Sequence, residues 1–290
     1  MADFRGYKAA TIYELLDNKK CEILYIESNH STHTEYAIKG IDRVLKIYVE
    51  KPISTSWDQF SQLLNKFKEK NAEIYAGYNR PFSKAFNIIN PHIEDVKKPI
   101  SLSSFISAHQ LGDEHWYRTL EEGTRIAGNV GHWIDLLVYL MAKRGHIPET
   151  FNIGINYADK NHLDDNISIT VSNKYSDIMQ LMLSARNETF ESTIESVDFQ
   201  CGDLIAKIDD YRHMKLLKNE YYKKHNFSKK DVGNQNTINQ PFNKDKRAFD
   251  EIVISTALML KIVDMVRVGD NYQIFNPKEK INEISNFYNS

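Results

Sequence analysis

The sequence predicts an α/β protein, with a short parallel sheet in its first part and a larger, mostly antiparallel open sheet in its second part. Between residues 20 and 80, apolar strand-like runs alternate with helical patterns, which is typical of parallel strands joined by crossover helices. Between residues 151 and 214, strand-like runs follow one another without helices, which implies antiparallel pairing. A length of 290 residues suggests two domains, or one large one.

The bulk composition excludes several classes of protein. The net charge is −2 and 41% of the residues are hydrophobic, so apolar cores are expected and a strongly basic nucleic-acid surface is not. No apolar run approaches the roughly 18 residues that a membrane span needs. Cys21 and Cys201 give neither a disulfide framework nor the spacing of a metal site, so we expect buried free thiols. Because Met1–Lys8 lacks the apolar stretch of a signal peptide, we expect a cytoplasmic protein.

The first part is expected to hold a short helix, then three strands with helices between them. Thr11 and Glu14 form a capping box at the start of the first helix. A second helix follows the loop at residues 27–33, and Ser31 or Thr32 is its expected cap. The strands are expected at residues 21–26, 44–49 and 73–78, and a third helix at about 54–67.

The strand from Val44 to Val49 ends abruptly in Glu50-Lys51-Pro52. Its apolar run is typical of a parallel strand that is covered on both faces. Pro52 has no N–H to donate to a ladder, so the strand must stop there. Ligands of open α/β sheets bind at the carboxyl ends of the strands, which makes Glu50 and Lys51 candidate site residues. The alternative is a solvated pair of charges at an ordinary strand end.

The second part begins near residue 84 and starts with an alternating strand from Ile100 to His109. The segment Gly123–Asp135 leads into an apolar helix whose expected C-cap is Gly145. His132 lies at the start of this helix, where a histidine taken alone is interpreted as a cap-region residue. Further strands are expected at residues 151–157, 166–172, 178–185, 192–200 and 204–214. A long loop is expected at 219–245 and a helix at 247–267, ending at Gly269.

Several segments together carry a resemblance to a known family. They are Glu50-Lys51-Pro52, Gly77–Phe82, Gly123–Asp135, and the N-x-x-x-H pattern of Asn29 and His33. From about residue 10 to 215 the chain resembles the glucose–fructose oxidoreductase, inositol dehydrogenase and MocA (Gfo/Idh/MocA) family. The resemblance implies a truncated Rossmann-type parallel sheet followed by an α+β domain with a mostly antiparallel open sheet. It divides the chain into a partial dinucleotide-binding domain, residues 1–83, and a C-terminal substrate and dimerisation domain, residues 84–290.

The glycine-rich turn of a dinucleotide site is missing from the sequence. The 12 glycines include no G-x-G, and the strands that family members have ahead of this turn and after it are missing too. We therefore expect weak or absent NAD(P) binding by this chain alone, because the pyrophosphate normally rests on the helix after that turn. The strand at residues 21–26 loses a neighbour, so we expect Met1–Lys8, a second copy or another polypeptide to cover its edge.

The resemblance also implies roles for particular residues. Lys51 and His132 match the family's catalytic residues. The implied cofactor contacts come from Asn29, His33, Glu50 and Lys51, and the implied substrate contacts from Tyr78, Arg80 and Asn129. Other interpretations stay open for three of them: helix capping for Asn29, a structural role for His33 and an interdomain salt bridge for Arg80.

The activity that the resemblance implies is hydride transfer between NAD or NADP and a hydroxyl or ketone of a sugar, polyol or nucleotide sugar. Lys51 would stabilise the developing alkoxide and His132 would take the proton. The expected partners are that small molecule and further copies of the chain, joined through the second sheet, with no nucleic acid and no membrane. Gly128, Asn129 and Gly131 depart from the family pattern, and with the missing turn they favour an alternative, an inactive family remnant with a binding or assembly role.

Overall fold

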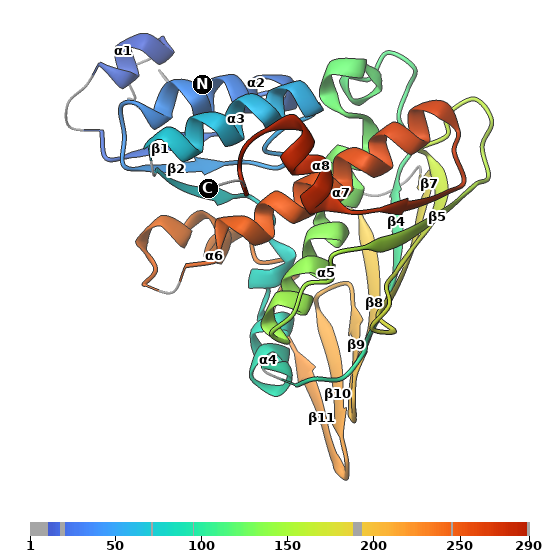
Figure 1. Ribbon diagram of the computed structural model, residues 1–290. Helices are drawn as coiled ribbons and strands as arrows, with labels where there is room; N and C mark the ends of the chain where they lie inside the picture. Colours follow the sequence, from blue (N-terminus) through green and yellow to red (C-terminus); the bar gives the residue numbers. More distant parts are fainter. Residues whose placement is uncertain are drawn as a thin grey trace.

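The computed structural model describes residues 11–17, 21–70, 72–94, 96–187, 193–244 and 246–288. Two sheets organise these residues, with helices packed between and around them (Figure 1). The expectation that Met1–Lys8 covers a strand edge lies outside the described residues. None of the described helices is long and apolar enough to cross a membrane.

The first sheet is parallel and has the order β1-β2-β3, with strands Ile23–Ile26, Lys46–Val49 and Glu73–Ala76. Helices α2 (His30–Ile41) and α3 (Trp57–Lys70) lie on one side of it, and α6 (Asn234–Ile238) lies on the other (Figure 1). Helix α1 (Ile12–Leu16) begins with the predicted capping box, since Thr11 and Glu14 exchange both bonds. Strand β2 is shorter than predicted: it begins at Lys46, and the Leu45 side chain before it is 74% exposed.

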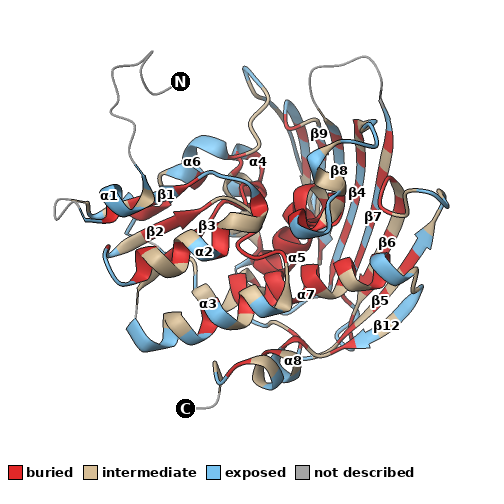
Figure 2. Ribbon diagram, turned by 90° about the horizontal axis from the view of Figure 1, so that it is seen from above, coloured by how far each residue is buried: buried red, intermediate tan, exposed pale blue. Residues whose placement is uncertain are grey.

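The second sheet has the order β11-β10-β9-β8-β4-β7-β6-β5-β12, and its neighbours are antiparallel except for the parallel pair β4–β7. Its strands are β4 (Ile100–His109), β5 (Phe151–Tyr157), β6 (Asn166–Ser172), β7 (Ile178–Asn187), β8 (Ile194–Cys201), β9 (Leu204–Asp209), β10 (His213–Lys218), β11 (Tyr221–Asn226) and β12 (Tyr272–Phe275). Buried and exposed residues alternate along most of them, so one face of the sheet packs on helices and the other is open (Figure 2). The predicted fold class is thereby confirmed.

Two predictions for this region were wrong. Residues 204–214, expected as one strand, form the hairpin β9–β10, which turns at Asp210 and Tyr211 with positive φ angles of 45° and 52°. The predicted loop at 219–245 contains β11, α6 and the 3₁₀ turn Gln240–Phe242. The reason for the second error is that β11 is the edge strand and its side chains are largely exposed, so it carries no alternation of apolar and polar residues.

The helices α5 (Gly131–Lys143) and α7 (Phe249–Val268) pack against each other on the inner face of the large sheet (Figure 2). Their buried apolar side chains belong to one continuous core that also includes the small sheet. The other helices are α4 (Lys84–Ile93) and α8 (Pro277–Ile284).

The C-terminal segment contacts the small sheet and its helices. Gln240 Nε2 donates to the carbonyl of Ala76 at 3.1 Å, and Trp57 Nε1 donates to Asp264 at 2.6 Å. The chain from α6 to the end of the described residues therefore packs on the small sheet and its helices, and through α7 also on α5. The division of the chain at residue 83 stays a prediction.

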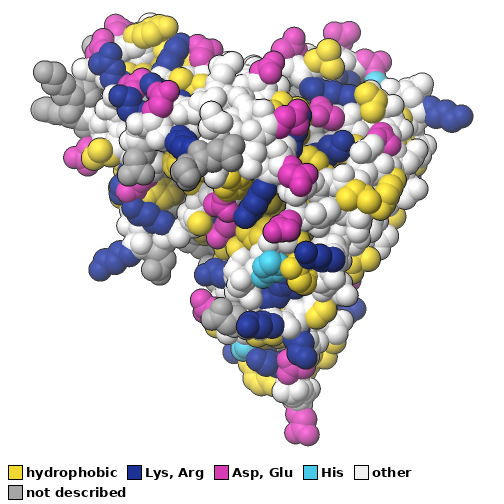
Figure 3. Space-filling view, in the orientation of Figure 1, with side chains coloured by type: hydrophobic (Ala, Val, Ile, Leu, Met, Phe, Trp, Pro, Cys, Tyr) yellow, Lys and Arg dark blue, Asp and Glu magenta, His cyan; other side chains and the backbone are white. Residues whose placement is uncertain are grey.

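Both cysteines are free thiols, as predicted; Cys201 is buried and Cys21 is only partly buried. Acidic and basic side chains are mixed over the face of the molecule shown in Figure 3.

Candidate active site

The carboxyl end of β2 places Glu50 and Lys51 at the edge of the small sheet. The Glu50 carboxylate accepts bonds from the Tyr48 hydroxyl at 3.1 Å and from the backbone N–H of Lys51 at 3.0 Å. It lies directly over Gly77 at the end of β3, where a Cβ atom would come within 2.7 Å of the carboxylate carbon. A glycine is therefore required at position 77 for Glu50 to keep this place.

The Lys51 ammonium leaves the small sheet and donates to the carbonyl of Gly128 at 2.7 Å. Its contact is thus a neutral backbone oxygen in the second part of the chain. Burial lowers the pKa of Lys51 to about 8, with a further lowering from the Arg80 charge that Glu50 opposes. Lys51 can therefore lose its proton at a much lower pH than an ordinary lysine.

His132 lies in the first turn of α5, which a π-helical turn at Ile126–Val130 leads into. The ring is 9% exposed, and its Nδ1 atom is buried without a hydrogen-bond partner. Burial lowers the pKa of His132 well below its usual value, and the nearby charges of Arg80 and Lys51 lower it further. The imidazole is therefore neutral at pH 7. The free Nδ1 atom is therefore available to form a hydrogen bond with a ligand.

Lys51 and His132 come close to each other because both adjoin the same turn. The acceptor of Lys51, Gly128, lies four residues before His132, about one turn of the chain away. The sequence segments that hold the two residues are 81 positions apart, and the fold brings them together.

Arg80 pairs with a carboxylate of the large sheet. In the turn Arg80–Phe82, its guanidinium contacts Asn79 Oδ1 and Glu195 Oε1, and it lies 5.5 Å from the Trp133 ring. Both Arg80 and Glu195 are buried. The ion pair joins the turn after β3 to strand β8, as in the salt-bridge alternative to substrate contact.

Tyr78 and Asn129 differ in how far a ligand could reach them. Tyr78 is fully buried, its ring lies edge-on to His132 at 6.2 Å, and its hydroxyl points at the sulfur of Met259 at 3.8 Å. The structure thus gives Tyr78 a packing position behind His132, and we do not include it among the proposed substrate contacts. Asn129 is partly exposed beside Gly128.

The loop after β1 holds Asn29 and His33 in different settings. Asn29 is exposed at the N-cap position of α2, and its side chain makes no capping bond. His33 is buried, with its ring nitrogens 2.7 Å from the Pro52 carbonyl and 2.9 Å from the Ser28 carbonyl. His33 thus ties the loops after β1 and β2 together, which fits the structural interpretation. The expected cap at Ser31 or Thr32 was wrong, because both lie inside α2: the Ser31 hydroxyl donates to Glu122 at 2.7 Å and the Thr32 hydroxyl to the Asn29 carbonyl at 2.8 Å.

Sequence reasoning missed a cluster of residues that lies against this site. His30 begins α2, and its ring lies 4.8 Å from the Trp116 ring and 5.1 Å from the Tyr117 ring. Glu122 binds the first turn of α2 through Ser31 N at 3.3 Å and the Ser31 hydroxyl. Three consecutive rings at positions 115–117, in a segment without helical or strand periodicity, were the available signal.

Tyr117 explains why position 128 is a glycine. A Cβ atom there would lie 2.3 Å from Tyr117 Cε2 and 2.7 Å from Cζ. The aromatic ring thus fills the place that a side chain at 128 would take.

Across the described ranges, no group of His, Cys, Asp or Glu residues could hold a metal ion.

Comparisons with known proteins agree with this architecture. Residues 2–78 match the family model GFO_IDH_MocA, described as an oxidoreductase family with an NAD-binding Rossmann fold. Over 95 residues, 32% of this chain, the sequence is 28% identical to scyllo-inositol 2-dehydrogenase (NAD(+)) of Bacillus subtilis (strain 168). That match spans 28% of the length of the relative.

Solved structures share the fold over most of their length. A levoglucosan dehydrogenase in complex with NADH and levoglucosan has a TM-score of 0.75 at 12% identity, covering 94% of this chain and 86% of that one. The protein GenD2 from gentamicin A biosynthesis, in complex with NAD, has a TM-score of 0.73 at 14% identity and coverages of 95% and 84%. A dehydrogenase (MviM) from Clostridium difficile has a TM-score of 0.67 at 18% identity and coverages of 91% and 84%. Residues 2–78 thus match the Gfo/Idh/MocA family model, and the described chain shares the fold of these solved structures.

Proposed function

We propose that this protein is an NAD(P)-dependent oxidoreductase that transfers a hydride to or from a sugar, polyol or nucleotide sugar. The observation that carries the proposal is the pair of Lys51 and His132. A cation held by a backbone carbonyl lies one turn from a neutral, buried imidazole with a free Nδ1 atom. Such a pair suits a reaction in which a hydroxyl loses a proton as its carbon loses a hydride.

Each residue has a different role when an alcohol is oxidised. The Lys51 ammonium lies where it can stabilise the negative charge that develops on the substrate oxygen. His132, neutral at pH 7, takes the hydroxyl proton, and the C–O bond becomes a carbonyl. Glu50 holds the backbone of Lys51 and thereby positions the cation. A nicotinamide cofactor, when bound, accepts the hydride.

The described residues fit the reacting end of such a cofactor. The Glu50 carboxylate lies over Gly77 at the carboxyl edge of the sheet, and Tyr78, the next residue, packs edge-on to the His132 ring at 6.2 Å. Asn29, exposed at the start of α2, and Asn129, beside Gly128, are further candidate contacts to the cofactor and the substrate. His33 would act only by holding the loops. Arg80 would act through its charge, because Glu195 occupies its guanidinium.

A second candidate function is a family member that binds its ligand without redox chemistry. It is favoured by the lack of any G-x-G in the sequence and by the ring of Tyr117 over Gly128. Titration of the 290-residue chain with NADH and with NADPH distinguishes the two. Micromolar affinity would overturn the expected weak NAD(P) binding and support the oxidoreductase, and no measurable binding by calorimetry supports the second function.

The direct test is an assay of NAD(P)H formation at 340 nm on a panel of polyols and sugars. We would use scyllo-inositol, myo-inositol, levoglucosan and glucose, each with NAD⁺ and NADP⁺. Turnover that is lost in Lys51→Met and His132→Asn, and kept in His146→Asn, supports the proposal, since His146 is exposed and follows the opposite end of α5. Turnover that survives both site variants contradicts it.

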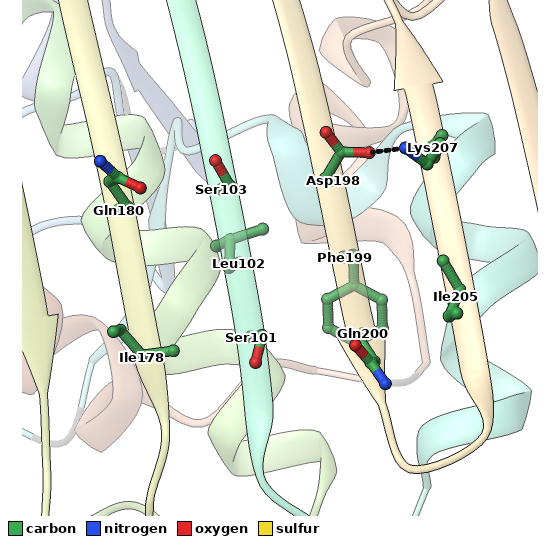
Figure 4. Close-up of a pocket in the computed structure, with 10 residues that line it drawn as sticks. All are labelled: Ser101, Leu102, Ser103, Ile178, Gln180, Asp198, Phe199, Gln200, Ile205 and Lys207. Atoms are coloured by element: carbon green, nitrogen blue, oxygen red, sulfur yellow. Dashed lines mark ion pairs between the residues drawn. The ribbon is translucent and has the colours of Figure 1, made fainter.

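The open face of the large sheet is the proposed interface with further copies of the chain. Phe105 on β4 and Met182 on β7 are register neighbours there and are 45% and 44% exposed. A pocket on the same face is lined by Ser101, Ser103 and Gln180, with the Asp198–Lys207 ion pair at its side (Figure 4). Light scattering tests this: a dimer that Phe105→Lys converts to a monomer supports the interface, and a monomeric wild type contradicts it.

A further inference from the structure

A second histidine, His30, lies at the same edge of the small sheet as Lys51. His30 opens α2 just after the carboxyl end of β1, and Lys51 follows the carboxyl end of β2. The two strands are parallel neighbours in register, Ile26 against Val49, so the residues that follow them emerge side by side.

Contacts with the second part of the chain locate the two side chains more closely. His30 Nδ1 lies 3.0 Å from the Glu122 carbonyl oxygen, and Lys51 Nζ lies 2.7 Å from the Gly128 carbonyl oxygen. The Tyr117 ring touches both places, since it packs 5.1 Å from the His30 ring and against Gly128. His30 is therefore separated from the acceptor of Lys51 by about the width of one aromatic ring.

The protonation state of His30 follows from its surroundings. A backbone carbonyl can only accept, so the Nδ1 atom that faces Glu122 carries the hydrogen. Burial lowers the pKa of His30 to about 4, although the bond to Glu122 opposes this, so the ring is neutral at pH 7. Its Nε2 atom then holds a free lone pair on the opposite edge of the ring and is a hydrogen-bond acceptor.

We propose that His30 is a substrate-binding residue whose Nε2 accepts a hydrogen bond from a second hydroxyl of the substrate. The inference rests on the proposed function and narrows its substrate class. One hydroxyl reacts between Lys51 and His132, and a neighbouring hydroxyl donates to His30. Two imidazole acceptors around one cation suit a vicinal diol, as in a cyclic polyol or a sugar ring, better than an alcohol with a single hydroxyl.

Three substitutions separate this role from a structural one. His30→Asn keeps an N–H near Nδ1 for Glu122 and removes the acceptor. His30→Gln places an amide oxygen near Nε2 and gives up the bond to Glu122. His30→Phe keeps the ring contacts with Trp116 and Tyr117 and loses both polar atoms.

The proposal predicts that His30→Asn and His30→Gln rank in opposite order by activity and by melting temperature. We expect His30→Asn to melt close to the wild type and to lose about tenfold in kcat/KM, the usual effect of one hydrogen bond. We expect His30→Gln to melt lower and to keep activity within about threefold, with His30→Phe losing in both. If activity instead follows melting temperature across the three variants, His30 is structural and the proposal is overturned.

A second measurement does not depend on turnover. Nitrogen-15 NMR of the histidine rings at pH 7 should show His30 as the Nδ1–H tautomer, and scyllo-inositol with NADH should shift its Nε2 resonance. An Nε2–H tautomer overturns the proposal outright. Ligands that shift His132 and leave His30 unchanged overturn this inference and leave the proposed function standing. Ligands that shift neither histidine overturn both.

Discussion

Buried charges are treated in two different ways in this molecule. In the scaffold, the buried Arg144 meets a carboxylate: both of its terminal nitrogens donate to Asp177, one of them at 2.8 Å. At the edge of the small sheet, the Lys51 ammonium meets a backbone carbonyl. His132 Nδ1 has no partner at all. The ion pair neutralises the arginine charge. At the edge of the small sheet, an ammonium meets a neutral acceptor and a ring nitrogen has no hydrogen-bond partner.

This difference separates parts of the chain that maintain the fold from parts that can act on a ligand. A buried ion pair whose members satisfy each other has nothing left to offer to a substrate. A desolvated lysine with a neutral acceptor, beside a histidine with a free nitrogen, costs stability and leaves groups that can bind a ligand. By this criterion Arg144 belongs to the scaffold, whereas Lys51 and His132 are the proposed site residues.

The largest expected effect is on stability, from loss of a scaffold carboxylate. Asp177 accepts from Arg144, from Ile100 N at 2.8 Å and from Asn173 at 2.9 Å. Asp177→Ala leaves a buried guanidinium without its partner and should lower the free energy of unfolding by about 3–5 kcal/mol. Denaturant unfolding measures this.

The control is an exposed ion pair of the large sheet, Asp198–Lys207, at 3.3 Å (Figure 4). Asp198→Ala should change the free energy of unfolding by no more than about 1 kcal/mol. Equal costs for Asp177→Ala and Asp198→Ala would break the distinction between scaffold and surface charges.

The next effect is on turnover, from loss of the site cation. Lys51→Met removes the charge that stabilises the developing alkoxide and should lower kcat by about 100- to 1,000-fold. Lys39→Met is the matched control, since Lys39 pairs with Glu35 on the surface of α2 and should leave kcat unchanged. A Lys51→Met variant with full kcat would contradict the assignment of Lys51 to the site.

The effect of Lys51→Met on the stability of the fold should also depend on pH. The pKa of Lys51 falls from 10.5 to about 8 on folding, so the folded state is penalised for holding the protonated form. The penalty is complete below pH 8 and disappears as the pH rises towards 10.5. Lys51→Met should therefore be more stable relative to the wild type at pH 7 than at pH 10, as followed by thermal unfolding. The opposite trend would mean that a carboxylate neutralises Lys51 in the folded state.

A smaller effect should follow from crowding position 128. Gly128→Ala forces a Cβ atom to within 2.3 Å of the Tyr117 ring and should lower the free energy of unfolding by about 1–3 kcal/mol. Combining it with Tyr117→Ala makes room for the methyl group, so the double variant should lose less than the sum of the single ones. Additive losses would show that the two residues do not touch.

Much of the fold could be predicted from the sequence because its signals are local. The run from Val44 to Val49 with Pro52 after it predicted β2, and the bounds predicted for β4, β5 and β6 are those of the structure. Strand β11 could not be found, because Tyr221–Asn226 is polar and its pairing with β10 is decided by the hairpin that joins them.

The site was predictable only in part, for a related reason. Lys51 and His132 stood out because they follow recognisable motifs. His30 and Tyr117 did not, because their importance comes from contacts between segments more than 80 residues apart. Resemblance could not locate them, and only the packing of the loop at residues 115–122 against α2 shows them.

The smallest expected effect concerns backbone groups and extends the comparison from charges to hydrogen bonds. Strand β4 is paired on both sides, whereas within the described ranges β1 pairs only with β2. Lys46 N donates to the Glu22 carbonyl and Glu50 N donates to the Ile26 carbonyl, so the alternate residues Ile23 and Tyr25 direct their N–H groups away from β2. An apolar edge of this kind invites pairing, and natural proteins cover such edges. We therefore expect the amides of Ile23 and Tyr25 to exchange slowly, because another segment or a second copy pairs with them. The amide of Phe105 in β4, which is paired on both sides, is the reference for slow exchange. Hydrogen exchange read by NMR on a sample of known mass decides it, since rapid exchange at both amides in a soluble monomer would show that the edge is open.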